Sequence, residues 1–203
     1  MKKIVLAMAV FAMVGIVSAE TIVQFNFEDA TKNPSTEATG VSSTAIGAWR
    51  EIDDGAPFND EALAAFNGHD AWRTRNDASL EEHYATFTIT VAAGKQLEIT
   101  DFALQLYDRD ADLFPTLTFA YSTDGGDNYT DMGTLDPLDI GSGDWFDQSL
   151  TLGTPVSGLE GDIIIRMTTG GANGGYDYFE HDLLTVNGTL SATQVAGTVV
   201  IVK

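Results

Sequence analysis

The sequence predicts an all-β protein, an antiparallel β-sandwich. Short segments in which apolar and polar residues alternate recur along the chain, and clusters of Gly, Asp, Asn and Pro separate them. Little of the sequence has helical character, and strands do not alternate with helices as a parallel sheet requires. These two observations favour two antiparallel sheets packed on one core.

The N-terminus has the pattern of a secretory signal peptide. Two lysines follow the first methionine, residues 4–17 are apolar, and Val17-Ser18-Ala19 is a small-residue cleavage site. We expect cleavage to leave Glu20 as the first residue of a secreted protein, extracellular or at the cell surface. The apolar run is too short for a comfortable membrane span, so no membrane insertion is expected.

The composition is strongly acidic and lacks cysteine. Among 203 residues, 30 Asp and Glu face 10 Lys and Arg, and the net charge is −20. Such a surface repels nucleic acid and anionic membranes, so neither is expected as a partner. An acidic surface can bind divalent cations. The alternative is that the acidic residues only keep the protein soluble. Without cysteine, no disulfide stabilises the fold.

The first predicted strand covers residues 21–28. Val23, Phe25 and Phe27 share one of its faces, with the two-residue period of a half-buried strand. Residues 29–43 are rich in Asp, Asn, Thr, Ser, Gly and Pro without periodicity, which predicts a surface loop.

The next stretch is the least regular part of the sequence. A short strand is expected over residues 48–52. A brief helix is predicted over residues 59–66, because Asn59 is a good N-cap and residues 61–65 favour helix.

Two long strands follow, over residues 84–91 and 96–107, joined by an Ala-Ala-Gly-Lys turn. In the second strand the apolar positions change parity between Ile99 and Phe102. Since a strand alternates strictly between its two faces, this change predicts a bulge or bend near Asp101.

A hairpin is predicted next. Residues 117–121 alternate in a strand pattern, and Asp-Gly-Gly at 124–126 then reverses the chain, because Gly takes positive φ. Residues 122–129 read Ser-x-Asp-x-Gly-x-x-Tyr, which resembles the Asp-box hairpin of sialidase propellers and other extracellular β-proteins. That resemblance implies a structural turn in which Asp124 ties the loop together and Tyr129 packs into the core.

Three further strands are expected, over residues 145–152, 162–168 and 178–190. A Gly-Thr-Pro turn follows the first of them. The sandwich domain should therefore cover residues 20–190, and residues 191–203 form a C-terminal tail or an extra edge strand.

Several motifs resemble one family of secreted proteins. They are the Phe27-Glu28 end of the first strand, the hairpin of residues 84–99, the Tyr-Ser-Thr-Asp-Gly-Gly turn at 121–126, the Leu-x-Gly-Asp-Ile-Ile-Ile-Arg segment at 159–166 and the Asp-Leu-Leu-Thr-Val-Asn-Gly strand at 182–188. Together they are similar to the secreted β-jelly-roll modules of environmental Gram-negative bacteria, which are like carbohydrate-binding modules. Such proteins often end in a Pro-Glu-Pro sorting signal, and the tail here has none.

Glu28 and Asp182 are the candidate metal ligands. In calcium-binding carbohydrate-binding jelly rolls, which the chain resembles, an acidic residue near the first strand and an Asp near the last hold a structural Ca²⁺. Ca²⁺ prefers carboxylate and carbonyl oxygens, and it would tie the two ends of the domain together. Strand parity places Glu28 opposite the apolar face, so the site requires a bend. The alternative is a plain surface acid or N-terminal cap.

The candidate sugar-binding residues are aromatic residues with polar neighbours, the pattern of a small-molecule site. They are Trp72 with Arg73, Trp145 between two aspartates, and Tyr176 with Tyr178. The alternative for each aromatic residue is the sandwich core.

No motif predicts catalysis. The sequence has no Cys, no Gly-x-Ser-x-Gly and no His-Glu-x-x-His. The patterns favour an exported, non-enzymatic, Ca²⁺-stabilised module that binds an extracellular glycan or surface matrix. The alternatives are a structural or adhesive surface protein, which assembles through an edge strand such as residues 195–202, and a glycoside hydrolase using two of its carboxylates. Neither the glycan nor the oligomeric state follows from the sequence.

Overall fold

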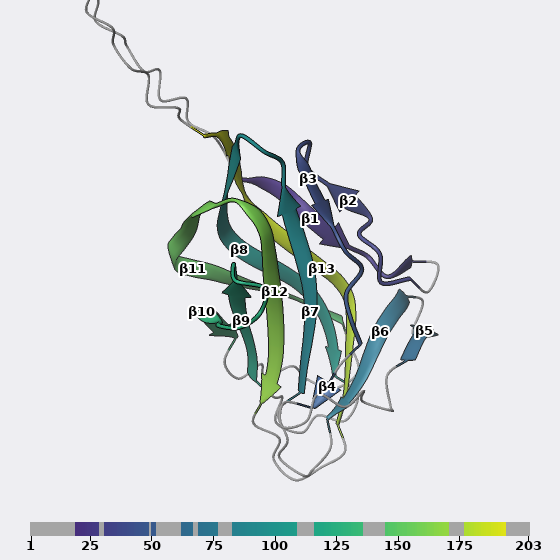
Figure 1. Cartoon of the computed structure of the whole chain (residues 1–203). Helices are drawn as coiled ribbons and strands as arrows, with labels where there is room; N and C mark the ends of the chain where they lie inside the picture. Colours follow the sequence, from purple (N-terminus) through teal and green to yellow (C-terminus); the bar gives the residue numbers. More distant parts are fainter. Residues whose placement is uncertain are drawn as a thin grey trace, which may run out of the picture.

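A computed structural model describes residues 19–28, 31–48, 50–51, 62–66, 69–76, 83–108, 116–135, 145–170 and 177–193. These residues form two antiparallel sheets packed face to face, seen in Figure 1. The predicted antiparallel β-sandwich of jelly-roll type is confirmed. β1 begins at Glu20, the residue expected to follow signal-peptide cleavage. Residues 1–18 and 194–203 lie outside the described residues.

The first sheet, called here the β13 sheet, has β13 (Asp177–Ala192) near its centre. Its main path runs β11 (Trp145–Leu159), β8 (Lys95–Asp108), β13, β1 (Glu20–Phe25) and β2 (Thr36–Glu37). β6 (His69–Asn76) also pairs with β13, and β5 (Ala62–Phe66) pairs with β6. One edge of β13 pairs with β8, and β1 and β6 share its other edge.

The second sheet, called here the β12 sheet, is centred on β12 (Gly161–Gly170). Its path runs β10 (Thr130–Leu135), β9 (Thr116–Ser122), β12, β7 (His83–Val91) and β3 (Val41–Ser43), and β4 (Arg50–Glu51) pairs with β7. All its pairings are antiparallel.

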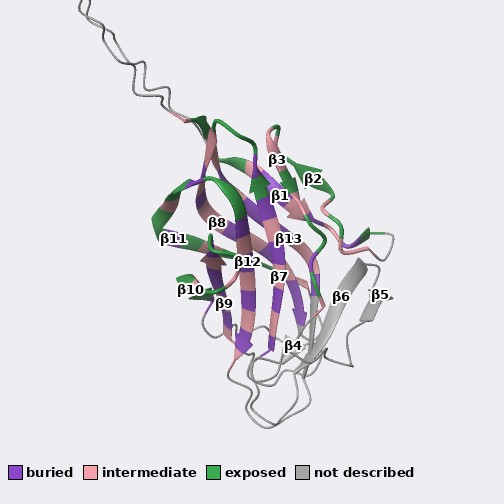
Figure 2. Cartoon of the chain, in the orientation of Figure 1, coloured by how far each residue is buried: buried purple, intermediate pink, exposed green. Residues whose placement is uncertain are grey.

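The core lies between the two sheets. Along β7 and β12 buried residues alternate with more exposed ones, as Figure 2 shows, because successive side chains point to opposite faces. Aromatic residues join the sheets: Phe102 of β8 stacks on Phe119 of β9 with ring centroids 4.1 Å apart, and Phe25 of β1 meets Phe87 of β7 edge to face at 5.0 Å.

The bulge predicted near Asp101 is confirmed. Ile99 and Phe102 are both fully buried. The register of β8 shifts at this point against both neighbours: Asp101 pairs with Asn187, whereas Ile99 pairs with Gly188. The extra residue rotates the strand so that apolar side chains on both sides of the bulge face the core.

The helix predicted over residues 59–66 is wrong for its described part. Residues 62–66 form β5, which pairs residue by residue with β6 from Ala62 opposite Arg73 to Phe66 opposite His69. Helix propensity is a weak preference, and sheet pairing overrides it here. β11 likewise continues through the turn predicted at residues 153–155 and ends at Leu159.

No described segment forms a helix long and apolar enough to cross a membrane.

Candidate functional site

The face of the β13 sheet that points away from the core carries a band of polar side chains across four strands. On β8 and β13, Gln105 and Thr185 alternate with core residues such as Leu104 and Leu184, and therefore point outward. We call the following six residues the polar strip: Gln24, Asp101, Gln105, Asp147, Thr185 and Asn187.

Cross-strand hydrogen bonds fix the polar strip. They join Gln105 Nε2 to Asp147 Oδ1 at 3.0 Å, Asn187 Nδ2 to Asp101 Oδ1 at 2.6 Å, and Gln24 Nε2 to Thr185 Oγ1 at 3.2 Å. Each bond links neighbouring strands, so the side chains are held before any ligand arrives. Amide and carboxylate groups that remain partly exposed have further hydrogen-bonding capacity.

An aromatic pair lies at one end of the polar strip. Trp145 of β11 is directly opposite Tyr107 of β8, and their ring centroids are 5.3 Å apart with 50° between the planes. Leu106 faces the core, so Tyr107 points to the outer face. Trp145 is half-buried and Tyr107 is buried. Trp145, a candidate from the sequence, thus lies beside polar groups on the outer face.

Tyr107 was missed as a candidate. The signal was present in the sequence: once the bulge near Asp101 is placed, the apolar positions Phe102, Leu104 and Leu106 assign Tyr107 to the opposite face. Its partner strand could not be named from the sequence, because the pairing with Trp145 joins residues from distant segments.

The backbone register brings other sequence candidates to the same end of the sheet. Arg73 of β6 pairs with Glu180 of β13, which pairs with Tyr107 on its other side. Trp72 pairs with His181, and Tyr178 pairs with Arg75. Tyr176 lies outside the described residues. The roles of these residues stay predictions.

Two backbone irregularities mark the candidate metal site. Phe27 has φ of 52°, the positive value of a left-handed residue, although its side chain is 1% exposed. It provides the bend that a site at Glu28 requires. Asp182 is the extra residue of a β-bulge, since β13 pairs His181 with Leu106 and then Leu183 with Gln105.

These two irregularities lie at the same end of the β1–β13 pair. The pairing ends at Phe25 opposite Leu184, two residues from Asp182. Both features interrupt regular strand geometry. Bulges and left-handed residues of this kind are over-represented at functional sites.

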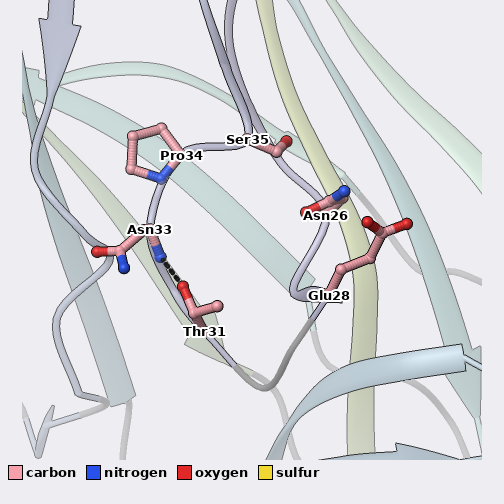
Figure 3. Close-up of a pocket in the computed structure, with 6 residues that line it drawn as sticks. All are labelled: Asn26, Glu28, Thr31, Asn33, Pro34 and Ser35. Atoms are coloured by element: carbon pink, nitrogen blue, oxygen red, sulfur yellow. Dashed lines mark hydrogen bonds between the residues drawn. The ribbon is translucent and has the colours of Figure 1, made fainter.

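Glu28 also borders an oxygen-rich hollow of about 370 Å³, lined by Asn26, Glu28, Thr31, Asn33, Pro34 and Ser35 and shown in Figure 3. Within it, the Asn33 amide donates to Thr31 Oγ1 at 2.9 Å. The described residues contain no cluster of three or more acidic or histidine side chains. A cation here would therefore need amide and carbonyl oxygens as well as carboxylates, which Ca²⁺ accepts.

The turn after β9 is held by one serine and one aspartate. Ser122 Oγ donates to Asp124 Oδ1 at 2.6 Å, and the Gly126 amide donates to Ser122 Oγ at 3.0 Å. Asn128 donates to Asp124 through its backbone at 3.0 Å and its side chain at 2.7 Å. The Ser122 hydrogen bond, followed by those from Asn128, holds the pKa of the Asp124 carboxyl far below its usual range.

The Asp-box resemblance implied that Tyr129 packs into the core. It does not. Its ring lies over the Arg166 guanidinium, 3.9 Å from the ring centroid, on the outer face of the β12 sheet. Ile165 and Met167 face the core, so Arg166 between them points outward and meets the ring. Burial raises the pKa of Tyr129, and the charge of Arg166 opposes that rise.

Comparisons with known proteins find similarity in folds only. No known protein family matches the sequence, and no curated protein resembles it. Among solved structures, TmCBM61 in complex with β-1,4-galactotriose is 14% identical, with 82% of this chain and 94% of that chain covered and a TM-score of 0.39. CpGH89CBM32-5 from Clostridium perfringens, in complex with GalNAc-β-1,3-galactose, is 16% identical, with 73% of this chain and 95% of that chain covered and a TM-score of 0.39. A structure described for carbohydrate-binding modules of the β-sandwich superfamily is 13% identical, with 80% and 60% covered and a TM-score of 0.38.

Proposed function

We propose that this chain is an exported, non-enzymatic β-sandwich module that binds carbohydrate at the cell surface or in extracellular matrix. The observation that carries the proposal is the aromatic pair Trp145 and Tyr107 beside the polar strip. A sugar ring has apolar C–H faces that pack on aromatic rings. It also has hydroxyls that exchange hydrogen bonds with amides and carboxylates.

The arrangement suits an oligosaccharide more than a single sugar. The polar strip crosses four neighbouring strands from β11 to β1. At about 4.8 Å between strands, it extends over about 14 Å. One sugar ring would pack on Trp145, and its hydroxyls would form hydrogen bonds with Gln105 and Asp147. Because the strip is already hydrogen-bonded, little side-chain ordering is required on binding.

Trp145→Ala should weaken binding of a neutral oligosaccharide at least tenfold, since a central aromatic contact contributes more than 1.4 kcal/mol. Glycan-array screening would identify a ligand, and calorimetry would measure its affinity. Tyr84→Ala is the matched control, because Tyr84 is also a half-buried outward aromatic but lies on the other sheet. Its affinity for the neutral ligand should equal that of wild type.

Three results would contradict the proposal. Equal affinity of wild type and Trp145→Ala for the ligand would show that the binding site does not include Trp145. Hydrolysis of the bound glycan would favour a glycoside hydrolase. Absence of any glycan ligand, together with oligomers lost on deletion of residues 195–203, would favour the adhesive alternative.

We also propose that Glu28 and Asp182 hold a structural Ca²⁺ with the help of the Asn26 amide. The bend at Phe27, the bulge at Asp182 and the oxygen-rich hollow support this proposal. Ca²⁺ takes 6–8 oxygen ligands, so backbone carbonyls and water would complete the shell. The ion would join β1 to β13 in a domain without disulfides.

Ca²⁺ at a hundredfold excess over its dissociation constant should raise the unfolding midpoint by about 5–10 °C, from about 2.7 kcal/mol of binding. Asp182→Ala should abolish the rise. Asp162→Ala is the control, because Asp162 is an exposed acid on β12 that bonds Thr90 at 2.7 Å. Thermal unfolding with Ca²⁺ and with chelator measures both. If Ca²⁺ still raised the unfolding midpoint of Asp182→Ala, Asp182 would not be a ligand of the ion.

A further inference from the structure

The outer face of the β12 sheet carries a second group of polar side chains, opposite the face that holds the polar strip. We call it the Arg166 quartet: Tyr84 and Thr86 of β7 with Arg166 and Thr168 of β12. Arg166 pairs with Thr86 and Thr168 pairs with Tyr84, so the four residues form a square on neighbouring strands. Each is partly exposed and alternates with buried core residues.

The Arg166 guanidinium packs against an aromatic ring. Tyr129 lies over it at 3.9 Å, and its Nε atom is covered. No described residue accepts a hydrogen bond from Arg166 or forms an ion pair with it. The side chain as a whole is nevertheless partly exposed, so it is accessible from solvent. In a chain with 30 acidic residues, a partly buried arginine without a carboxylate from the described residues is notable.

The hydroxyls around Arg166 are also unengaged within the described part of the chain. Thr86, Thr168 and Tyr84 form no side-chain hydrogen bond to any described residue. Other threonines on the same face do: Thr90 donates to Asp162 at 2.7 Å, and Thr118 bonds Thr134 at 2.9 Å. The unused donors and acceptors therefore gather around the cation.

We propose that the Arg166 quartet binds the carboxylate of an acidic sugar, a uronic acid residue. The forked guanidinium donates two parallel hydrogen bonds to a planar carboxylate. The Thr86 and Thr168 hydroxyls bond the sugar hydroxyls, and Tyr84 offers a ring face. Stacking on Tyr129 orients the guanidinium before binding, which lowers the entropy cost.

Charge separates this site from the proposed neutral-sugar site. The polar strip contains the carboxylates of Asp101 and Asp147, which repel an anionic ligand. The quartet has a cation and no carboxylate. The quartet thus adds a second ligand class, on the opposite sheet, to the one of the proposed function.

Backbone amide chemical shifts test the proposal directly. Titration with methyl β-D-glucuronide should move amides of β7 and β12, and the neutral methyl β-D-glucoside should not. Arg166→Gln should lower the affinity for the glucuronide at least tenfold, and Arg166→Lys should lower it less because the charge remains. Thr86→Val keeps the side-chain shape and should lower the affinity several-fold. This second variant keeps the test valid if Arg166→Gln folds poorly.

Two results would overturn the proposal. One is glucuronide binding that Arg166→Gln leaves unchanged. The other is acetate moving the same amides with equal affinity, which would indicate an anion site without sugar recognition. The outcome is separable from that of the polar strip: Trp145→Ala should leave glucuronide binding unchanged, and Arg166→Gln should leave neutral-oligosaccharide binding unchanged.

Discussion

Gly188→Ala should unfold the protein or lower its unfolding free energy by about 4 kcal/mol or more, at the severe end of single substitutions. A Cβ atom at Gly188 would overlap the carbonyl oxygen of Glu98 and lie 3.0 Å from its carbonyl carbon. Both are backbone atoms of β8, so no side chain is available to move aside. β13 would have to separate from β8 at the bulge where Gly188 pairs with Ile99.

Urea unfolding compares Gly188→Ala with a matched control. Gly153→Ala is suitable, because a Cβ at Gly153 meets no atom within 4 Å and the residue is exposed on β11. Its unfolding free energy should change by about 0.5 kcal/mol or less. Equal stability of Gly188→Ala and wild type would show that β8 and β13 approach less closely than described.

Acid should destabilise the protein through His181, well above the pH at which carboxylates titrate. His181 is 1% exposed, and burial lowers its pKa from 6.5 to about 3. Below pH 6.5 the unfolded chain binds a proton that the folded chain does not, so stability falls as pH falls. The loss is about 1.4 kcal/mol per pH unit and continues towards pH 3.

Urea unfolding at pH 7, 6, 5 and 4.5 measures this slope. Wild type should lose roughly 2–3 kcal/mol across the range, and His181→Gln should show a much flatter profile. Asp124 contributes in a separate, lower pH range. Because its pKa is lowered in the folded state, its contribution to stability is present above pH 4 and is lost as pH falls further. An identical slope in His181→Gln would contradict the role of His181.

The sequence predicted what depends on local alternation. The parity change between Ile99 and Phe102 located a bulge that the structure contains, and the alternation over residues 84–91 and 162–168 located β7 and β12. Local signals failed where pairing decides the conformation. Residues 62–66 favour helix by propensity but form β5, because β6 offers a complete ladder of backbone hydrogen bonds.

The candidate sites were predictable only in part. Trp145 stood out by its polar neighbours, whereas Tyr107 became significant only when the register placed it opposite Trp145. Tyr129 was assigned to the core by resemblance, but an arginine on the outer face of β12 provides its contact. The Arg166 quartet combines two strands far apart in sequence, and no motif within either strand indicates it.

The pairing of β1 with β13 joins segments that lie far apart in the chain. Glu20, at the start of the described chain, lies opposite Gly188, near its end. β1 therefore waits, during synthesis, for a partner strand that lies more than 150 residues later in the chain. Such long-range pairing slows folding, since a large loop must close before the contact forms. The β13 sheet therefore stays incomplete until β13 is available, because β13 pairs with β8, β1 and β6.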